Sequence, residues 1–563
     1  MEPNRVADVR HGTSRRAFLR LAVVVGAGAL LAACQAPSPP AGQQAPLAGG
    51  AAKPDTGEPR RGGALTFAVW DKLDDIDPPT TTGAAAAEVD LNLLDSLIAI
   101  DGDQKIYPHL ATKWTIEEGA KRFTFTLRDD VKFHDGTPLD STAVKRTWER
   151  IIDPATKAAG VVALLGPLDQ IQAPDPRTLV VTFKEPYPPL LLQIWRPYFG
   201  VMSNKYLDTL KPGDKAVAPV GSGPFKFGSR SADGVITLDA FRDYAWGHEL
   251  MKNRGAPYLD SVKFRAVTEA STRVSTLESG ESLLIDEISE PDFARLKADQ
   301  RFAFVEAPRR SHTLGFFINV TKPPTDDLAV RQAINWAVDR KTIVEKLFFN
   351  VHKVGVGPLS EGVWARSDEA EKRFGFEPKK AEQILDEAGW KASSGGIREK
   401  SGQKLSVLLA TFRSPWTEMA EAMQAQLRGV GIDLQIQKME RGPYLDFTRD
   451  YKHNLNASAS TNIDPDGILR VSYHSSNKPR SNFSGVADAQ LDALLDKGAT
   501  QDIGSAERRK TYEDAQMRLM DLAPFVSVMS QVRVEGMAAK VKGLRMSADG
   551  LNALPLSDVW LAG

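Results

Sequence analysis

One strand–helix–strand pattern constrains the fold of this chain more than any other feature. The apolar run LSVLLA at 405–410 reads as a strand, and IDLQIQ at 432–437 alternates as a second strand does. Between them, Ser414 suits a helix N-cap and Pro415 the first helical position. The apolar residues with helical spacing are Ala420, Met423 and Leu427. Two strands joined by a helix over so short a distance predict a parallel βαβ unit, and hence an α/β fold.

The length of the chain predicts more than one such unit. It has 563 residues, whereas a domain typically has about 100–200. We therefore expect two α/β lobes. Ligands of open α/β sheets bind beyond the carboxyl ends of the strands. This rule points to the loops after Val69, after Ala410 and after Ser458.

The first half of the body is richer in strands than the second. GGALTFAVW at 62–70, FTFTL at 123–127 and TLVVTF at 178–183 each have strand character, and few helices separate them. In FTFTL, every second residue is apolar, which is typical of a strand with one buried face. We expect a strand-rich extra subdomain in the first lobe.

Composition excludes several classes of protein. The net charge of −1 does not support a nucleic-acid partner. A single cysteine excludes an intrachain disulfide and a cysteine-based zinc site. The eight histidines are scattered, and the calcium-loop pattern that starts at Asn462 has Tyr473 where a glutamate is required. No motif of a metalloprotease, a P-loop or a serine hydrolase occurs. We expect no metal, no cofactor and no catalytic residues.

The N-terminus reads as an export signal. Arg15 and Arg16 precede an apolar run, Leu21 to Ala33, which is too short to span a bilayer. The arginine pair resembles the twin-arginine export motif, and LAAC at 31–34 resembles a lipobox, in which Cys34 would carry lipid. Residues 1–33 are then a signal peptide and 34–60 a disordered tether rich in Ala, Gly and Pro. The alternative is a plain N-terminal helix with a buried cysteine.

Seven stretches of the body resemble, in order, one family: the extracytoplasmic solute-binding proteins of ABC importers, family 5, which includes oligopeptide-, dipeptide- and nickel-binding proteins. The resemblance extends from about Arg61 to about Val534. The stretches are IYPHLATKW (106–114), FTFTLRDDVKFHDGTPLDSTAVKRTWERI (123–151), PVGSGPFKF (219–227), PYLDSVKFRAV (257–267), LAVRQAINWAVDRKTIVEKLF (328–348), FEPKKAEQILDEAGW (376–390) and QAQLRGVGIDLQIQ (424–437).

The resemblance implies a large type II two-lobe fold that closes on a small-molecule ligand. Lobe I would hold residues 61–308, lobe II 309–525, and 526–563 would return to lobe I. The resemblance implies that the strands SHTLGFFIN (311–319) and APFVSVMSQ (523–531) form the crossings between the lobes. The implied protein is a monomeric lipoprotein outside the cytoplasm. It binds a peptide or an oligosaccharide and delivers it to the permease and ATPase subunits.

Seven residues are candidates for ligand contact: Trp70, Ser222, Arg413, Trp416, Thr461, Asn462 and Asp464. Thr461 stands where the resemblance implies an aspartate that holds a peptide amino terminus. Its neutral hydroxyl is a poor counter-ion for an ammonium group. Either Asp464 takes over that role or the ligand has no amine there. Two other functions remain open at this stage, an anchored hydrolase and a sensor or chaperone module that has kept the binding fold.

Overall fold

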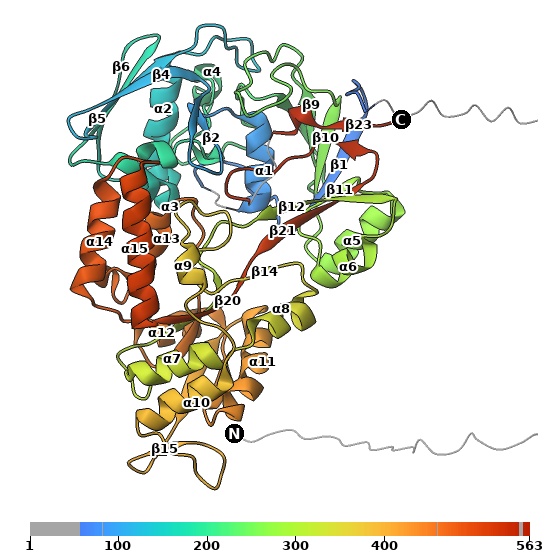
Figure 1. Cartoon of the computed structure of the whole chain (residues 1–563). Helices are drawn as coiled ribbons and strands as arrows, with labels where there is room; N and C mark the ends of the chain where they lie inside the picture. The colour runs from blue at the N-terminus through green and yellow to red at the C-terminus, as the bar shows by residue number, and fades with distance from the viewer. Residues whose placement is uncertain (1–56, 81–82, 459, 551–554) are drawn as a thin grey trace, which may run out of the picture. The chain divides into compact units, whose positions relative to one another are not determined.

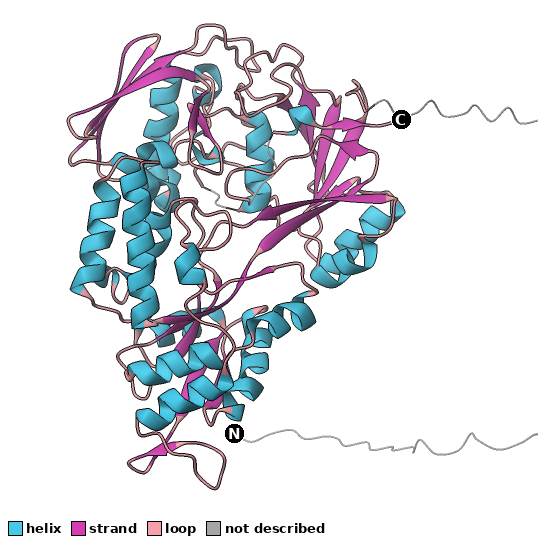
Figure 2. Ribbon diagram, in the orientation of Figure 1, coloured by secondary structure: helices cyan, strands magenta, loops and turns pink. Residues whose placement is uncertain are grey.

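The computed structural model describes residues 57–80, 83–458, 460–550 and 555–563, and these form two α/β lobes (Figure 1). Each lobe has its own main sheet with helices packed on it (Figure 2). The predicted signal segment with Arg15 and Arg16, the predicted lipidation site Cys34 and most of the tether lie outside the described residues. Within the described ranges, no helix has the length and apolar character needed to cross a membrane.

The main sheet of lobe I has seven strands in the order β12-β21-β11-β1-β10-β9-β8. Strand β1 is central and runs parallel to both of its neighbours, β10 and β11, whereas the other pairs are antiparallel. The bounds are β1 (Ala64–Val69), β8 (Phe225–Arg230), β9 (Ile236–Ala240), β10 (Ser261–Ala266), β11 (Leu284–Ile285), β12 (Phe302–Pro308) and β21 (Val532–Ala538).

Helices cover both faces of this sheet, which explains why β1 is apolar almost throughout. Leu65, Phe67 and Val69 join a core with helix α1 (Ala84–Leu93) on one face. Ala68 faces the other way and joins a core with helices α5 (Ala270–Ser279) and α6 (Glu290–Leu296). The strand predicted from GGALTFAVW is therefore buried on both sides.

The predicted strand-rich subdomain of lobe I is a four-stranded antiparallel sheet in the order β4-β5-β7-β6. Phe123, Phe125 and Leu127 of β5 are buried, and the residues between them are half-buried, as the alternation predicts. Helix α2 packs on this sheet through Val144, Trp148 and Ile151. The bounds are β4 (Ala111–Glu117), β5 (Arg122–Leu127), β6 (Leu168–Asp175), β7 (Thr178–Phe183) and α2 (Ser141–Ile152).

The sheet of lobe II has six strands in the order β14-β20-β13-β19-β17-β18. Strand β17 runs parallel to β18 and to β19, and helix α11 connects β17 to β18, so the predicted βαβ unit is confirmed. Helix α11 begins at Trp416 with Pro415 at the N-cap, so the predicted cap at Ser414 is wrong by one position. The bounds are β13 (Leu314–Ile318), β14 (Lys353–Val354), β17 (Ser406–Thr411), β18 (Asp433–Lys438), β19 (Leu455–Ser458), β20 (Phe525–Ser530) and α11 (Trp416–Gly429).

The remaining helices of lobe II pack in two groups. One group surrounds the sheet, and the other, α13 to α15, stands side by side with a core of its own (Figure 1). The bounds are α7 (Leu328–Ala337), α8 (Arg340–Phe348), α9 (Asp368–Glu371), α10 (Pro378–Glu387), α12 (Arg441–Arg449), α13 (Pro465–Tyr473), α14 (Ala489–Thr500) and α15 (Ala506–Leu522).

Short elements complete the described chain. They are the strand pairs β2 (Ile98–Ile100) with β3 (Ile106–Pro108), β15 (Glu399–Lys400) with β16 (Gln403–Lys404) and β22 (Val541–Lys542) with β23 (Trp560–Leu561), the helices α3 (Ala159–Val162) and α4 (Asn204–Leu207), and the 3-10 turns η1 (Pro154–Thr156), η2 (Ala163–Leu165), η3 (Pro188–Leu192), η4 (Pro197–Phe199), η5 (Ser475–Asn477) and η6 (Leu556–Asp558).

The main chain passes between the two main sheets twice. The first passage leads from β12 to β13 over residues 309–313, and the second leads from β20 to β21 through Gln531. Because β20 still belongs to the sheet of lobe II, lobe II extends to Ser530 rather than to residue 525. The two passages lie side by side, since the backbone N–H of Arg309 donates to the carbonyl of Gln531 at 2.9 Å.

Two adjacent isoleucines of α2 test this packing with identical chemistry. Ile151 is 0% exposed and Ile152 is 39% exposed. Ile151→Ala should lower the free energy of unfolding by about 2–5 kcal/mol, because it leaves a cavity in the subdomain core. Ile152→Ala should change it by less than about 1 kcal/mol. Urea unfolding measures both, and equal losses for the two variants would contradict the packing described here.

Candidate functional site

In lobe I, the three parallel strands end at one edge of the sheet. Val69 of β1 pairs with Ala266 of β10, and Ala68 pairs with Ile285 of β11, so the three carboxyl ends lie together. Trp70 follows β1, and Glu287 follows β11 by two residues. Glu287 has a φ of 43°, in the left-handed region, which a residue with a side chain seldom adopts. Such backbone strain is often found at functional sites.

Lobe II presents the corresponding edge of its own parallel strands. Strand β17 ends at Thr411, β18 at Lys438 and β19 at Ser458. Arg413 therefore follows β17 closely, and Thr461 follows β19. The predicted loops after β1, after β17 and after β19 all stand at carboxyl ends of parallel strands, where open α/β sheets bind their ligands.

The first chain passage joins these two edges. Ser311 forms a β-bridge with Thr461, and the backbone N–H of His312 donates to the carbonyl of Ser460 at 2.8 Å. The hydroxyl of Ser360 donates to the carbonyl of Arg309 at 2.8 Å. Arg309 is thus held where the passage leaves lobe I. We call Trp70, Glu287, Arg309, Arg413 and Thr461 the edge residues.

Arg309 is the electrostatic link between the lobes. Its Nη1 lies 3.8 Å from Oε1 of Glu287. Burial lowers the pKa of the Arg309 guanidinium; the negative charge of Glu287 opposes this effect, whereas the positive charges of Arg533 and Arg413 add to it. Arg309 therefore interacts electrostatically with a carboxylate of lobe I and with a cation of lobe II. An additional anion between the lobes would reduce the repulsion between Arg309 and Arg413.

A buried ion cluster supports the lobe I edge. Nη2 of Arg533 lies 3.6 Å from Oε1 of Glu88 on α1 and 3.6 Å from Oδ2 of Asp286, and its Nε also contacts Glu535. Arg273 of α5 approaches Asp286 from the other face, at 3.6 Å. Burial raises the pKa of the Asp286 carboxyl well above its usual range, although the positive charge of Arg533 counteracts it. The cluster joins α1, β11, β21 and α5 directly beneath Glu287.

The two candidate tryptophans differ in exposure. Trp70 is half-buried, and its Nε1 is buried without a hydrogen-bond partner among the described residues. Trp416 is 4% exposed and belongs to the core of lobe II. The guanidinium of Arg413 lies over Trp416, 5.2 Å from the ring centroid, and over Phe412 at 5.3 Å. Trp416 therefore forms a platform for Arg413 and does not face the strand edge itself.

Ser222 has a structural role. It is fully buried, and its hydroxyl donates to Oδ2 of Asp95 at 2.9 Å. Nε1 of Trp246 donates to the same oxygen at 2.9 Å, and His109 lies 3.4 Å from Oδ1. Burial raises the pKa of Asp95 to about 7, against the lowering effect of these hydrogen bonds. Ser222 fastens its Gly-Ser-Gly turn to Asp95, and we remove it from the proposed ligand contacts.

Asp464 is buried in an ion pair and does not lie at the edge of lobe II. It is 4% exposed, and its two oxygens accept from Nη1 and Nη2 of Arg508 at 2.9 Å each. Its Oδ1 also accepts from the backbone N–H of Asp466 at 2.7 Å, so it caps α13. Asn462 shapes the same turn by accepting from the N–H of Asp464 at 3.0 Å. Of the three candidates in this loop, only Thr461 is exposed.

Of the predicted set, Trp70 follows a strand end of lobe I, and Arg413 and Thr461 follow strand ends of lobe II; Glu287 and Arg309 are added to these candidates. Sequence reasoning missed these two because neither belongs to a recognisable motif. The strand-end rule, applied to β11 as well as to β1, would have found Glu287. Among the described residues, no group of three or more His, Cys, Asp or Glu side chains is arranged to hold a metal ion.

Comparison with known proteins gives consistent results. The model of the family described as "Bacterial extracellular solute-binding proteins, family 5 Middle" matches residues 105–480. Heme-binding protein A of Haemophilus influenzae is 28% identical over 478 residues, which is 80% of this chain and 84% of that protein. The dipeptide-binding protein of Escherichia coli K12 is 25% identical over 470 residues, 78% of this chain and 84% of that protein.

A solved structure shows the same fold. HbpA2 from Haemophilus parasuis superimposes with a TM-score of 0.78 at 23% identity, covering 89% of this chain and all of that chain. The predicted two-lobe architecture of this class, with its strand-rich subdomain in lobe I, is thereby confirmed.

The ion pair of Asp464 and Arg508 gives a prediction that separates a structural role from ligand contact. Asp464→Ala should lower the free energy of unfolding by about 3–5 kcal/mol, because it leaves Arg508 charged, buried and unpaired. The exposed pair Asp446 and Arg449 is the matched control, and Asp446→Ala should cost less than about 1 kcal/mol. Chemical unfolding without ligand measures both. An unchanged stability of Asp464→Ala would return Asp464 to the ligand contacts.

Proposed function

Because this chain belongs to the bacterial extracellular solute-binding proteins of family 5, we propose that it is the substrate-binding lipoprotein of an ABC importer. Members of this family are extracytoplasmic transport proteins rather than enzymes. In our proposal the protein captures an oligopeptide-sized solute in a cleft between the lobes. It then delivers the solute to the membrane permease, which works with its ATPase subunits, and the binding protein acts as a monomer.

One observation carries this proposal. Both lobes present carboxyl ends of parallel strands, and the first chain passage connects the two edges through the bridge between Ser311 and Thr461. A ligand held by both edges would favour the closed arrangement of the lobes by its differential affinity for that state. The two adjacent chain passages would then serve as the hinge.

The charges at the edges favour a zwitterionic, peptide-like ligand. Arg413 is exposed and has no ion pair within the described ranges, so its planar guanidinium is available to bind a ligand carboxylate in a bidentate way. Arg309 adds a second cation close by. On the lobe I side, Glu287 is partly exposed, and its Oε1 lies 3.8 Å from Nη1 of Arg309 and 3.7 Å from Nη1 of Arg533. An ammonium group would share this carboxylate with the two arginines. Glu287 would then replace the aspartate that Thr461 does not supply.

An oligosaccharide is the second candidate, and Trp70 favours it. A half-buried indole offers a face for stacking on a sugar ring, and its unpartnered Nε1 would donate to a hydroxyl. The similar proteins differ in the ligands that their names state, heme for one and a dipeptide for another. The family therefore does not decide between these candidates, and the edge charges are the reason that we favour the peptide.

A ligand panel with the purified chain tests the proposal. We expect di- to pentapeptides to raise the melting temperature and neutral oligosaccharides of similar size to leave it unchanged. A ligand at 100 times its Kd adds about 2.7 kcal/mol to the free energy of unfolding. Arg413→Ala should weaken peptide binding about 10- to 100-fold, since a charge-assisted hydrogen bond contributes about 1.5–3 kcal/mol.

Arg428 provides the control for this variant, because it is an exposed arginine at the other end of α11. Arg428→Ala should bind peptide as the unaltered chain does. If only oligosaccharides raise the melting temperature, the proposed ligand is an oligosaccharide rather than a peptide. Equal peptide affinity in the two variants would remove Arg413 from the ligand site.

Membrane anchoring is tested separately. If Cys34 carries lipid, Cys34→Ala should move the protein from the membrane fraction to the soluble fraction of the expressing cell, because a covalent acyl chain holds it at the bilayer. Cys34→Ala retained in membranes would contradict the lipoprotein proposal. In the same experiment, replacing Arg15 and Arg16 together by lysine should reduce export, because this removes the arginine pair of the proposed twin-arginine signal.

A further inference from the structure

The two lobes also meet away from the chain passages. The strand-rich subdomain of lobe I lies beside the helices α13 to α15 of lobe II (Figure 1). The 3-10 turn η3 of lobe I contacts α14, and the connections that precede α13 and α15 also reach the subdomain. We call this contact the subdomain interface. It joins the lobes at a place that the main chain does not cross.

One side chain of lobe II is buried completely in lobe I. Ile463 is 0% exposed and belongs to the hydrophobic core of the subdomain. Ile468, five residues further on, is also 0% exposed but packs in the core that α13 to α15 share. Ile503 packs against the subdomain core from the α14–α15 connection. Separation of the lobes at this interface would return Ile463 to water, so its burial favours the arrangement in which they touch.

A hydrogen bond holds the backbone of Ile463 at the same place. Gln104, in the β2–β3 turn of lobe I, is 3% exposed, and its Nε2 donates to the carbonyl of Ile463 at 2.9 Å. The φ of Gln104 is 66°, in the left-handed region, so the tight turn defines where its side chain starts. Because the apolar contact and the hydrogen bond involve the same residue, they form and break together.

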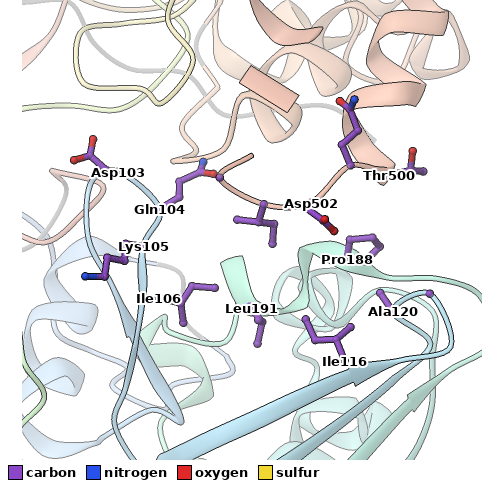
Figure 3. A pocket seen from close by; sticks show the side chains of 14 residues that line it. Asp103, Gln104, Lys105, Ile106, Ile116, Ala120, Pro188, Leu191, Thr500 and Asp502 are labelled. Carbon is purple, nitrogen blue, oxygen red and sulfur yellow. The ribbon is translucent and has the colours of Figure 1, made fainter. Parts of the chain in front are cut away.

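The rest of the subdomain interface is incompletely packed. A cavity of about 710 Å³ lies between the β2–β3 and β4–β5 turns of lobe I and the α14–α15 connection of lobe II (Figure 3). On its lobe I wall, Ile116 is 50% exposed. The lobes are therefore held together here by few side chains. An interface of this kind can separate without unfolding either lobe.

The loop that carries Ile463 is fixed to lobe II at both ends. At one end, the carbonyl of Ser460 accepts from the first chain passage, and Thr461 forms a β-bridge with the same passage. At the other end, Asp464 forms its buried ion pair with Arg508. Ile463 stands between them, two residues after the edge residue Thr461. A movement of Ile463 out of the subdomain therefore moves the edge of lobe II with it.

We propose that Ile463 is a latch between the lobes. Its insertion into the subdomain core, with the hydrogen bond from Gln104, holds the lobes closed, and its loop connects this state to the edge of lobe II. The closed arrangement is then populated before a solute binds, and the solute shifts an equilibrium that Ile463 already biases. Truncation of Ile463 lowers the apparent solute affinity by the factor by which the closed fraction falls. This last consequence rests on the proposed function, whereas the latch itself does not.

The test measures the arrangement of the lobes without solute. Spin labels at Lys113 of β4 and Lys510 of α15, both exposed, report the distance across the subdomain interface in the purified chain with Cys34→Ser. Ile463→Ala should raise the ratio of open to closed lobes at least about tenfold. Ile468→Ala is the matched control, because it removes the same side chain from within lobe II. It should lower the melting temperature and leave the distance distribution unchanged.

A second variant tests the latch from the lobe I side. Gln104→Asn tolerates the left-handed backbone, but its side chain is one methylene shorter and no longer reaches the carbonyl of Ile463. It should raise the ratio of open to closed lobes about 2- to 10-fold, as expected for the loss of one hydrogen bond. Hydrogen exchange of the β2–β3 turn should become faster in both latch variants, since opening exposes this turn. Thermal unfolding confirms that each variant is folded.

Two results would overturn the latch. One is the same distance distribution and the same exchange of the β2–β3 turn in Ile463→Ala and Ile468→Ala. The other is a folded Gln104→Asn variant that has the distances and the exchange of the unaltered chain. Neither result depends on whether a peptide or an oligosaccharide binds, so the latch and the proposed function fail independently.

Discussion

The arrangement of this molecule depends on two stretches of main chain that pass between the lobes next to each other. The hydrogen bond between Arg309 and Gln531 holds these passages together, and each leads directly from a strand of one sheet into a strand of the other. A pair of short, adjacent connections allows the lobes to rotate and prevents them from separating. It also fixes the place of Arg309 at the point where both strand edges can influence it. The electrostatic character of the proposed ligand site therefore follows from the topology.

The arginines at this junction differ in whether carboxylates or aromatic rings hold them. Arg533 is surrounded by Glu88, Asp286, Glu287 and Glu535 within lobe I, and Arg309 lies 3.8 Å from the same oxygen of Glu287 that Arg533 approaches at 3.7 Å. Arg413 rests on aromatic rings rather than on a carboxylate. An arginine held by stacking keeps its hydrogen-bond donors for another partner. The charge of Arg533 is balanced by carboxylates within lobe I, whereas Arg413 at the edge has no ion pair within the described ranges and could bind a ligand anion.

Local periodicity predicted the secondary structure correctly where the pattern of apolar residues within one segment was sufficient to define it. The alternation of Phe123, Phe125 and Leu127 predicted a half-buried strand, and the pattern at 405–437 predicted the βαβ unit and its parallel sheet. The strand-end rule pointed to the loops that contain Trp70 and Arg413, and the family resemblance pointed to Thr461 in the loop after β19. The helix start differs by one position because Pro415, and not Ser414, occupies the N-cap.

The roles of Ser222 and Asp464 could not be read in the same way, because their partners are distant in sequence. Asp95 lies 127 residues from Ser222, and Arg508 lies 44 residues from Asp464. A polar residue in a loop looks the same in a sequence whether it faces a ligand or a buried counter-ion. Only the fold shows which of these is present. Glu287 and Arg309 were missed for the converse reason, since the fold alone brings them to the edge.

The contacts between the lobes must also be weak enough for a ligand to control them. Away from the passages, the described residues include the hydrogen bond from Gln104 to Ile463, the contact of His352 with Glu290 at 3.0 Å, and the packing of Ile463 and Ile503 against the core of the lobe I subdomain. Full burial of one isoleucine contributes about 1.5–3 kcal/mol. Hydrogen bonds of this kind contribute about 0.5–1.5 kcal/mol each. A shift of the lobes from 1:99 to 99:1 requires about 5.5 kcal/mol of differential ligand affinity. The contacts between the lobes bias this equilibrium, and a ligand held by both strand edges acts on the same balance.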